Sequence, residues 1–290
     1  MMSSLVGAIK DVREGRELLN NLTLRELRSK YKRTALGWAW SMLNPLATIA
    51  IYSVVFGTIL HGVAPEGNPS GINNFTLYLS CALLTWNFTS SGVQATIPTL
   101  VGNANLIKKV YFPRELLIGA SVISWMVSFL IELGVLVAVI SVTGHMVLQW
   151  IPVVLVLVFI QFFLVLGFSL ALSALNVYYR DISYLSGIVF QAWMFLTPIV
   201  YPIESIDKAG NKHAFIPIKA DIWFWHDFPV RFVYKLNPMV HYVTAYRNLL
   251  YDGRFPGTSS LIYIGVMTPI VMIFGWSIFR RMIDRVAEEV

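Results

Sequence analysis

Six stretches of the chain are long and apolar enough to cross a membrane, and no other feature constrains the fold as strongly. A helix that spans the hydrocarbon core needs about 20 mostly apolar residues. Hydrophobic residues make up 56% of the chain and charged residues only 13%, against about 25% in a soluble protein. The sequence therefore predicts an all-α membrane protein and excludes an ordinary soluble enzyme. The predicted transmembrane helices are 35–61, 73–100, 116–142, 150–176, 185–202 and 259–280.

The positions of the basic residues indicate which side of the membrane each loop faces. Lys and Arg are enriched in the cytoplasmic loops of membrane proteins. If the N-terminus is inside, eight of them fall in residues 1–33 and three in loop 101–115. The short outer loops 62–72 and 143–149 then contain none. We therefore predict that both termini are cytoplasmic. The formal net charge of +6 reflects this orientation, so nucleic acid is not an expected partner.

The segment before the first span is expected to lie along the inner membrane surface. Residues 5–22 place apolar side chains near one helical face, which is typical of an amphipathic interface helix. The sequence Thr-Leu-Arg-Glu at 23–26 fits a capping box, which predicts that a new helix starts there. We therefore divide the chain into a cytoplasmic interface segment, 1–33, and a transmembrane domain, 34–290.

Two segments between the spans are also expected to form helices. Loop 101–115 mixes apolar and basic side chains, which favours a short cytoplasmic helix. Its apolar face could be a docking surface, or it could pack against the protein's own inner helices. Residues 203–258 are too long for a simple loop and are rich in aromatic side chains. They predict interfacial or re-entrant helices on the outer side.

Motifs for catalysis and for nucleotide binding are missing from the sequence. It contains no P-loop, no H-E-x-x-H and no G-x-S-x-G, and its five histidines lack metal-ligand spacing. We therefore expect no catalytic residue, no metal and no cofactor on this chain. A cytoplasmic docking helix on a chain that has no ATP-binding motif suggests a transporter driven by a separate ATPase. Glu132 is the one carboxylate well inside a predicted span, where it could be structural or line a pore.

Four blocks of sequence follow one another in an order that points to a family. They are LRELRSKYKRTALGWAW at 24–40, NANLIKKVYFPRE at 103–115, LNVYYRDI at 175–182 and LNPM at 236–239. Together they resemble the permease subunits of ATP-binding-cassette polysaccharide exporters, which carry O-antigen, teichoic acid, capsule and related lipid-linked glycans. The stretch 203–235 departs from the pattern because it is longer than usual.

The resemblance implies a homodimer of six-span subunits in a bacterial inner membrane. Two separate ATPase subunits would bind ATP and Mg²⁺, and the cargo would be a polysaccharide on a polyprenyl pyrophosphate. The second block would be the coupling helix that contacts the ATPase. The residues assigned to coupling are Asn105, Lys108, Lys109, Tyr111, Phe112, Pro113, Arg114 and Glu115.

The first block would mark the cytoplasmic entrance, where basic side chains suit a pyrophosphate headgroup. Ordinary anchoring to anionic membrane lipids is the alternative role for these side chains. The residues concerned are Arg28, Lys30, Lys32 and Arg33.

Aromatic side chains could line the path of the glycan, because a flat ring binds the apolar face of a sugar weakly. The alternative is that these rings face lipid. The candidates are Trp38, Trp40, Trp86, Phe88, Trp193 and Phe195. The two prolines near the end of the fifth span should kink or break that helix. With nearby aromatic residues they form a predicted outer gate of Pro198, Tyr201, Pro202, Trp223 and Trp225.

Two other functions are compatible with the sequence. The chain could be a permease of the same kind that carries a drug or another lipid. It could also be a membrane-embedded enzyme that processes glycans, for which acidic residues near a membrane face would be needed. The acidic candidates are Asp181, Asp207, Asp221 and Asp227.

Overall fold

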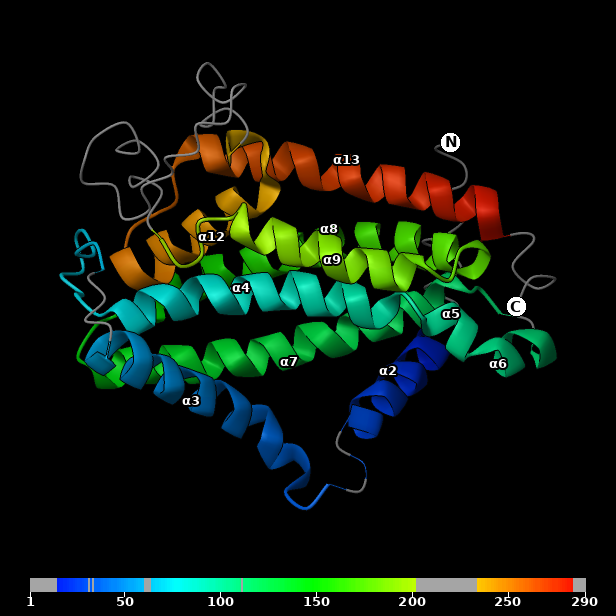
Figure 1. Cartoon of the computed structure of the whole chain (residues 1–290), viewed down its shortest axis with the longest axis horizontal. Helices are drawn as coiled ribbons and strands as arrows, with labels where there is room; N and C mark the ends of the chain where they lie inside the picture. Colours follow the sequence, from blue (N-terminus) through cyan, green and yellow to red (C-terminus); the bar gives the residue numbers. More distant parts are fainter. Residues whose placement is uncertain are drawn as a thin grey trace.

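The computed structural model describes residues 15–30, 32, 34–59, 64–110, 112–201 and 234–283. Every regular element within these ranges is a helix, as the sequence predicts, and the long helices lie side by side (Figure 1). The elements are, in order, α2 (Arg16–Lys30), η1 (Gly37–Ala39), α3 (Trp40–Tyr52), η2 (Ser53–Ile59), α4 (Phe75–Thr96), α5 (Thr99–Gly102), α6 (Ala104–Lys109), α7 (Glu115–Val142), η3 (Leu148–Trp150), α8 (Ile151–Tyr178), α9 (Ile182–Phe195), α12 (Pro238–Arg247), η4 (Asn248–Asp252) and α13 (Thr258–Ile283).

Among the residues that the structure describes, three helical segments are long and apolar enough to cross a membrane. They are α7, η3 with α8, and α13. Two shorter apolar helices cover Trp40–Phe56 and Ile182–Phe195, and α4 is long but more polar. The membrane class of the chain is therefore confirmed, while the number of six spans stays a prediction.

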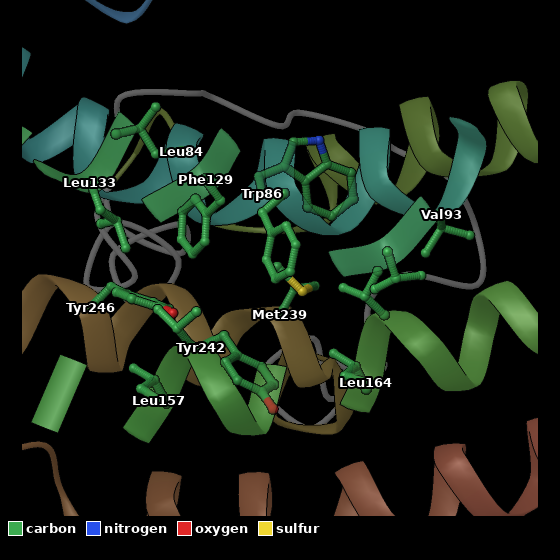
Figure 2. Packing of buried hydrophobic residues seen from close by; sticks show 14 of the residues in the cluster. Leu84, Trp86, Val93, Phe129, Leu133, Leu157, Leu164, Met239, Tyr242 and Tyr246 are labelled. Atoms are coloured by element: carbon green, nitrogen blue, oxygen red, sulfur yellow. The ribbon is translucent and has the colours of Figure 1, made fainter. Parts of the chain in front are cut away.

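Helix α4 can be more polar than its neighbours because it is enclosed by them. Its hydroxyls bond to carbonyls of their own helix, for example Thr96 Oγ1 to Gly92 O at 2.6 Å. Gln161 of α8 donates to the Thr85 carbonyl at 3.0 Å and to Thr89 Oγ1 at 2.9 Å. Polar groups inside a membrane must be satisfied in this way, since no water is available. Figure 2 shows α4 side chains meeting those of α7, α8 and α12 in one core.

Helices α8 and α13 approach each other closely at two glycines. A Cβ on Gly167 would lie 2.8 Å from Cα of Met272, and a Cβ on Gly275 would overlap the carbonyl oxygen of Gly167. Small residues allow two helix backbones to touch, which strengthens dispersion contacts within a membrane.

The interface helix differs from its prediction. Helix α2 is continuous from Arg16 to Lys30, so the predicted helix start at Thr23 is wrong. The Thr23 hydroxyl donates to the Leu19 carbonyl at 2.8 Å, inside the helix, instead of capping a new one. Burial of Leu22 and Leu27, on either side of Thr23, favours one uninterrupted helix.

The fifth predicted span ends early, as its prolines predict. Helix α9 stops at Phe195, three residues before Pro198. Proline has no backbone N–H and its ring clashes with the carbonyl of the preceding turn, so the helix cannot continue through it. Part of the predicted 203–258 segment forms α12 and η4, at the end of the bundle opposite α6 (Figure 1). Residues Pro202, Trp223 and Trp225 lie outside the described residues.

Candidate functional site

The short helix α6 presents a basic surface at one end of the bundle. Ile107 is buried and holds the helix against the protein, with Leu106 packed beside it. Asn105, Lys108 and Lys109 are exposed on the other side. Three of the predicted coupling residues are therefore available to a partner, while Tyr111 lies outside the described residues.

The residues that follow α6 are half-buried and join it to α13. A guanidinium nitrogen of Arg114 donates to the carbonyl oxygen of Ile283, at the end of α13. Glu115 forms an ion pair with Arg280 at 3.6 Å. Phe112 packs against the core beside Pro113. The structure thus places these predicted coupling residues at a joint between helices and not on the exposed face of α6.

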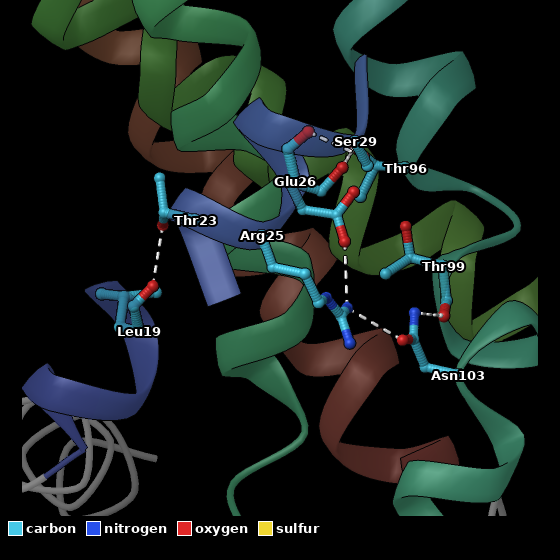
Figure 3. Close-up of polar contacts among 9 residues, drawn as sticks. Leu19, Thr23, Arg25, Glu26, Ser29, Thr96, Thr99 and Asn103 are labelled. Atoms are coloured by element: carbon cyan, nitrogen blue, oxygen red, sulfur yellow. Dashed lines mark hydrogen bonds and ion pairs between the residues drawn. The ribbon is translucent and has the colours of Figure 1, made fainter. Parts of the chain in front are cut away.

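Helix α2 is connected to the start of α6. Arg25 Nη2 donates to Asn103 Oδ1 at 2.9 Å and to Glu26 Oε1 at 2.9 Å (Figure 3). Asn103 directly precedes α6, and its amide nitrogen donates to the Thr99 carbonyl at 2.8 Å. The interface helix therefore contacts the residue that directly precedes the predicted coupling helix.

Of the four basic residues predicted at the entrance, Arg28 and Lys32 are exposed and Arg33 lies outside the described residues. Lys30 behaves differently. Its ammonium donates to Ser128 Oγ at 3.0 Å and to the Ser124 carbonyl at 3.2 Å, and it lies 3.9 Å from the centroid of the Trp125 ring. This ammonium is therefore bound to α7.

Sequence reasoning missed this role of Lys30, although a signal was present. Ser124, Ser128 and Glu132 recur every four residues in an otherwise apolar span, so they lie on one face of α7. Glu132 is half-buried and interacts electrostatically with Lys30. Its environment therefore favours the structural alternative over the pore-lining one.

Two of the predicted channel aromatics lie in the protein core. Trp86 is 3% exposed and Phe88 is 2% exposed. Phe88 stacks on Phe129 with ring centroids 4.7 Å apart, and Trp86 meets Trp193 edge to face at 5.6 Å. A sugar cannot reach the faces of Trp86 and Phe88 in this conformation.

The other predicted aromatics differ in their accessibility. Trp193 Nε1 donates to Asn237 Oδ1 at 2.8 Å, so this ring is fixed against the start of α12. Trp40 is 37% exposed and Phe195 is 69% exposed. The side chain of Trp38 is outside the described part of the chain.

A buried arginine holds the predicted gate segment after α9. Arg247 of α12 donates to the carbonyls of Pro198 at 2.7 Å and Ile199 at 2.5 Å. Its Nε donates to the Tyr78 carbonyl at 3.3 Å, and its guanidinium lies 3.7 Å from the centroid of the Tyr78 ring. This one side chain thus satisfies two carbonyls that lie beyond the end of α9. Arg247 is not among the predicted site residues, and no sequence signal pointed to this contact.

Tyr201 completes the described part of the predicted gate. Its hydroxyl lies 2.7 Å from that of Tyr234 and donates to the Phe195 carbonyl at 2.9 Å. The end of α9 is thus bonded to the start of α12 through Asn237 and, through Tyr201, to Tyr234, which precedes α12.

One acidic residue of the enzyme alternative lies in the described ranges. Asp181 is exposed at the start of α9, whereas Asp207, Asp221 and Asp227 fall outside the described residues.

Comparison with known proteins supplies an independent view of the chain. The family described as ABC-2 type transporter matches residues 17–220. The O-antigen export system permease protein RfbA of Myxococcus xanthus is 24% identical over 286 residues, which are 99% of this chain and 100% of the relative. A protein of that name from Klebsiella pneumoniae is 26% identical over 94% of both chains. The polysialic acid transport protein KpsM of Escherichia coli is 21% identical over 89% of this chain and 91% of the relative.

Proposed function

Because the chain belongs to the ABC-2 type transporter family, we propose that it is the permease subunit of an ATP-driven exporter of a lipid-linked polysaccharide. The observation that carries this proposal is similarity along nearly the whole chain to permeases named for O-antigen export. Similarity to a polysialic acid transport protein supports a polysaccharide cargo over a drug. The polymer would be joined to polyprenyl pyrophosphate.

The partner ATPase supplies the energy in this proposal. It contacts the exposed face of α6, with Lys108 and Lys109 as the charged groups. Arg114 and Glu115 then join the end of α6 to α13, through Ile283 and Arg280. A displacement of α6 is thus passed to two long helices of the bundle. ATP and Mg²⁺ stay on the partner.

The proposed assembly contains two copies of this chain and two ATPase subunits in a bacterial inner membrane, with both termini and α6 in the cytoplasm. Support for a second copy comes from apolar faces that a single copy leaves exposed. On α3, Met42 and Ile51 are exposed, and on α9, Ile188 and Val189 are exposed. Lipid or protein must cover such surfaces.

The contacts with the cargo follow from which side chains remain accessible. Arg28 and Lys32 are the described basic residues free to meet a pyrophosphate at the entrance, because Lys30 is held by α7. Of the predicted channel aromatics whose side chains the structure describes, Trp40 and Phe195 are the exposed ones, so we assign them to the path of the sugar.

Depletion of the chain in its native cell tests the proposal. We expect a lipid-linked polysaccharide to accumulate on the cytoplasmic side, since synthesis continues while export stops. Lipid extraction and mass spectrometry identify the polymer, and re-expression of the wild-type chain should clear it. Accumulation of a drug-like molecule or a glycan-free lipid would contradict the proposed cargo. Turnover of a lipid-linked glycan by the purified chain alone would favour an enzyme.

Charge reversal on α6 tests the proposed docking surface. A variant with both Lys108→Glu and Lys109→Glu should lose co-purification with the ATPase by about tenfold, as expected for loss of a charged contact of about 1.4 kcal/mol. Its melting temperature should not change, because both side chains are exposed. Lys32→Glu is the matched control, exposed but on another segment. Full retention of the ATPase by the double variant would exclude this face as the docking surface.

A further inference from the structure

Helix α2 contacts the chain at two points on either side of the bend between α6 and α7. At one point Arg25 bonds to Asn103, directly before α6, at 2.9 Å. At the other, Lys30 bonds to Ser128 at 3.0 Å. Ser128 is the fourteenth of the 28 residues of α7 (Glu115–Val142), so it lies at the middle of that helix. Helix α2 therefore forms a second connection between α6 and α7, in parallel with the covalent one through 110–114.

The body of α2 is also held against the bundle by apolar side chains. Leu22 and Leu27 are buried on its inner face. The side chain of Leu19 reaches to 3.7 Å from where a Cβ on Gly119 of α7 would lie. A helix of 15 residues bonded along its length is stiff compared with an irregular segment. A displacement at Arg25 is therefore carried along the helix to Lys30.

The contact of Lys30 with α7 is the more informative of the two. A lysine at a membrane surface normally extends its ammonium toward the headgroups, where the charge is hydrated. Lys30 instead turns into the protein, where burial lowers its pKa to about 8, although Glu132 and Glu26 act to raise it. The free energy lost by leaving water is offset by its contacts with Ser124, Ser128 and Trp125. A residue that only anchored α2 to lipid would have no reason to make these contacts.

We propose that α2 is a strut that transmits the motion of α6 to the middle of α7, with Arg25 and Lys30 as its two attachment points. The proposal rests on the proposed function and names how coupling to the ATPase is achieved. The covalent connection enters α7 at its first residue, whereas the contact through α2 reaches its middle. The Arg25 side chain is exposed, so its contact contributes little to the stability of the protein and mainly fixes α2 beside Asn103. Lys30 is therefore the positioning residue on which transmission depends.

Measurement of the polymer exported per ATP hydrolysed tests the strut. The complex of the full chain with its ATPase is reconstituted in vesicles that contain the lipid-linked polymer. Lys30→Met keeps the length of the side chain but removes the ammonium. We expect ATP hydrolysis to stay within about twofold of wild type, and export per ATP to fall about tenfold, the size of an ordinary coupling free energy. A variant that was only unstable would lose hydrolysis and export together.

Two further variants make the result specific to this contact. Lys30→Arg keeps the charge and its donors, so it should retain most of the export per ATP. Arg16→Met removes an exposed positive charge from the start of the same helix and should behave as wild type. A normal ratio in Lys30→Met, or an equal loss in Arg16→Met, would overturn the proposal.

A second readout separates the strut from the proposed function. If the wild-type complex exports no polymer, the proposed function fails, and the strut is judged on the motion of α7 alone. Spin labels at Val142, at the end of α7, and at Ile262 of α13 occupy exposed positions. In the complex, the distance between them should change on ATP binding in wild type and not in Lys30→Met. A change that persists in Lys30→Met, or that is absent from wild type, would overturn the strut.

Discussion

Gly275→Ala is expected to lower the stability of this protein more than any other single methyl group added to its long helices. The new Cβ would overlap the carbonyl oxygen of Gly167, and both atoms belong to helix backbones that cannot rotate out of the way. Helices α8 and α13 would have to separate, and they lose dispersion contacts along their length when they do. Overpacking of this kind costs about 3 kcal/mol. The melting temperature of the purified chain should therefore fall by about 6–12 °C.

Gly265→Ala provides the matched control for that measurement. Gly265 is on the same helix, ten residues earlier, and a Cβ there would meet no atom within 4 Å. Alanine is also the better helix former, so this variant should melt at the wild-type temperature or slightly above it. Equal melting temperatures for the two alanine variants would show that the close contact between Gly167 and Gly275 does not limit stability.

Arg247→Met is expected to release the segment that follows α9. The variant removes the donors to the carbonyls of Pro198, Ile199 and Tyr78, and methionine has none to replace them. Each buried carbonyl left without a partner costs about 1–3 kcal/mol, partly offset because the guanidinium no longer has to leave water. Hydrogen exchange at the amides of residues 197 and 199–201 should therefore rise by at least about tenfold, corresponding to 1.4 kcal/mol or more.

Two other substitutions test how Arg247 protects the segment after α9 from hydrogen exchange. Arg247→Lys keeps the charge, but a single ammonium cannot bond to carbonyls on two separate segments, so only part of the protection should return. Arg254→Met is the control, because Arg254 is close in the chain but largely exposed and paired with Asp252 at 3.0 Å. Wild-type exchange at residues 197 and 199–201 in Arg247→Met would show that the surrounding apolar packing holds this segment without the arginine.

The predictions that came true depend on local chemistry. The apolar stretches predict helices because a chain in lipid must satisfy its own backbone hydrogen bonds. The end of α9 before Pro198 follows from the missing N–H of proline. A helix in loop 101–115 follows from its pattern of apolar and basic side chains, and α6 is found there.

Predictions that depended on which helix lies beside which were less successful. Thr23 carries a capping signal, but burial of the leucines around it favours a continuous α2. Tryptophan occurs in protein cores, at lipid interfaces and along sugar-binding paths, so the residue type alone could not show that Trp86 is buried. Lys30 was assigned to a headgroup because a basic residue near a membrane usually meets one.

The sequence by itself determined that this chain is a helical membrane protein of a recognisable permease type, because the length of an apolar stretch and the order of four motifs are properties of the chain alone. Only the tertiary structure decided what the scarce polar groups do. It brought Lys30 to the middle of α7, Arg247 to the carbonyls released at Pro198, and Gly275 against Gly167. These partners are 48 to 108 residues apart in the chain, and no rule of local sequence relates them. The contacts of Lys30 and Arg247 exist because a buried polar group must find its partner within the folded bundle. The contact between the two glycines exists because small residues let two helix backbones pack closely.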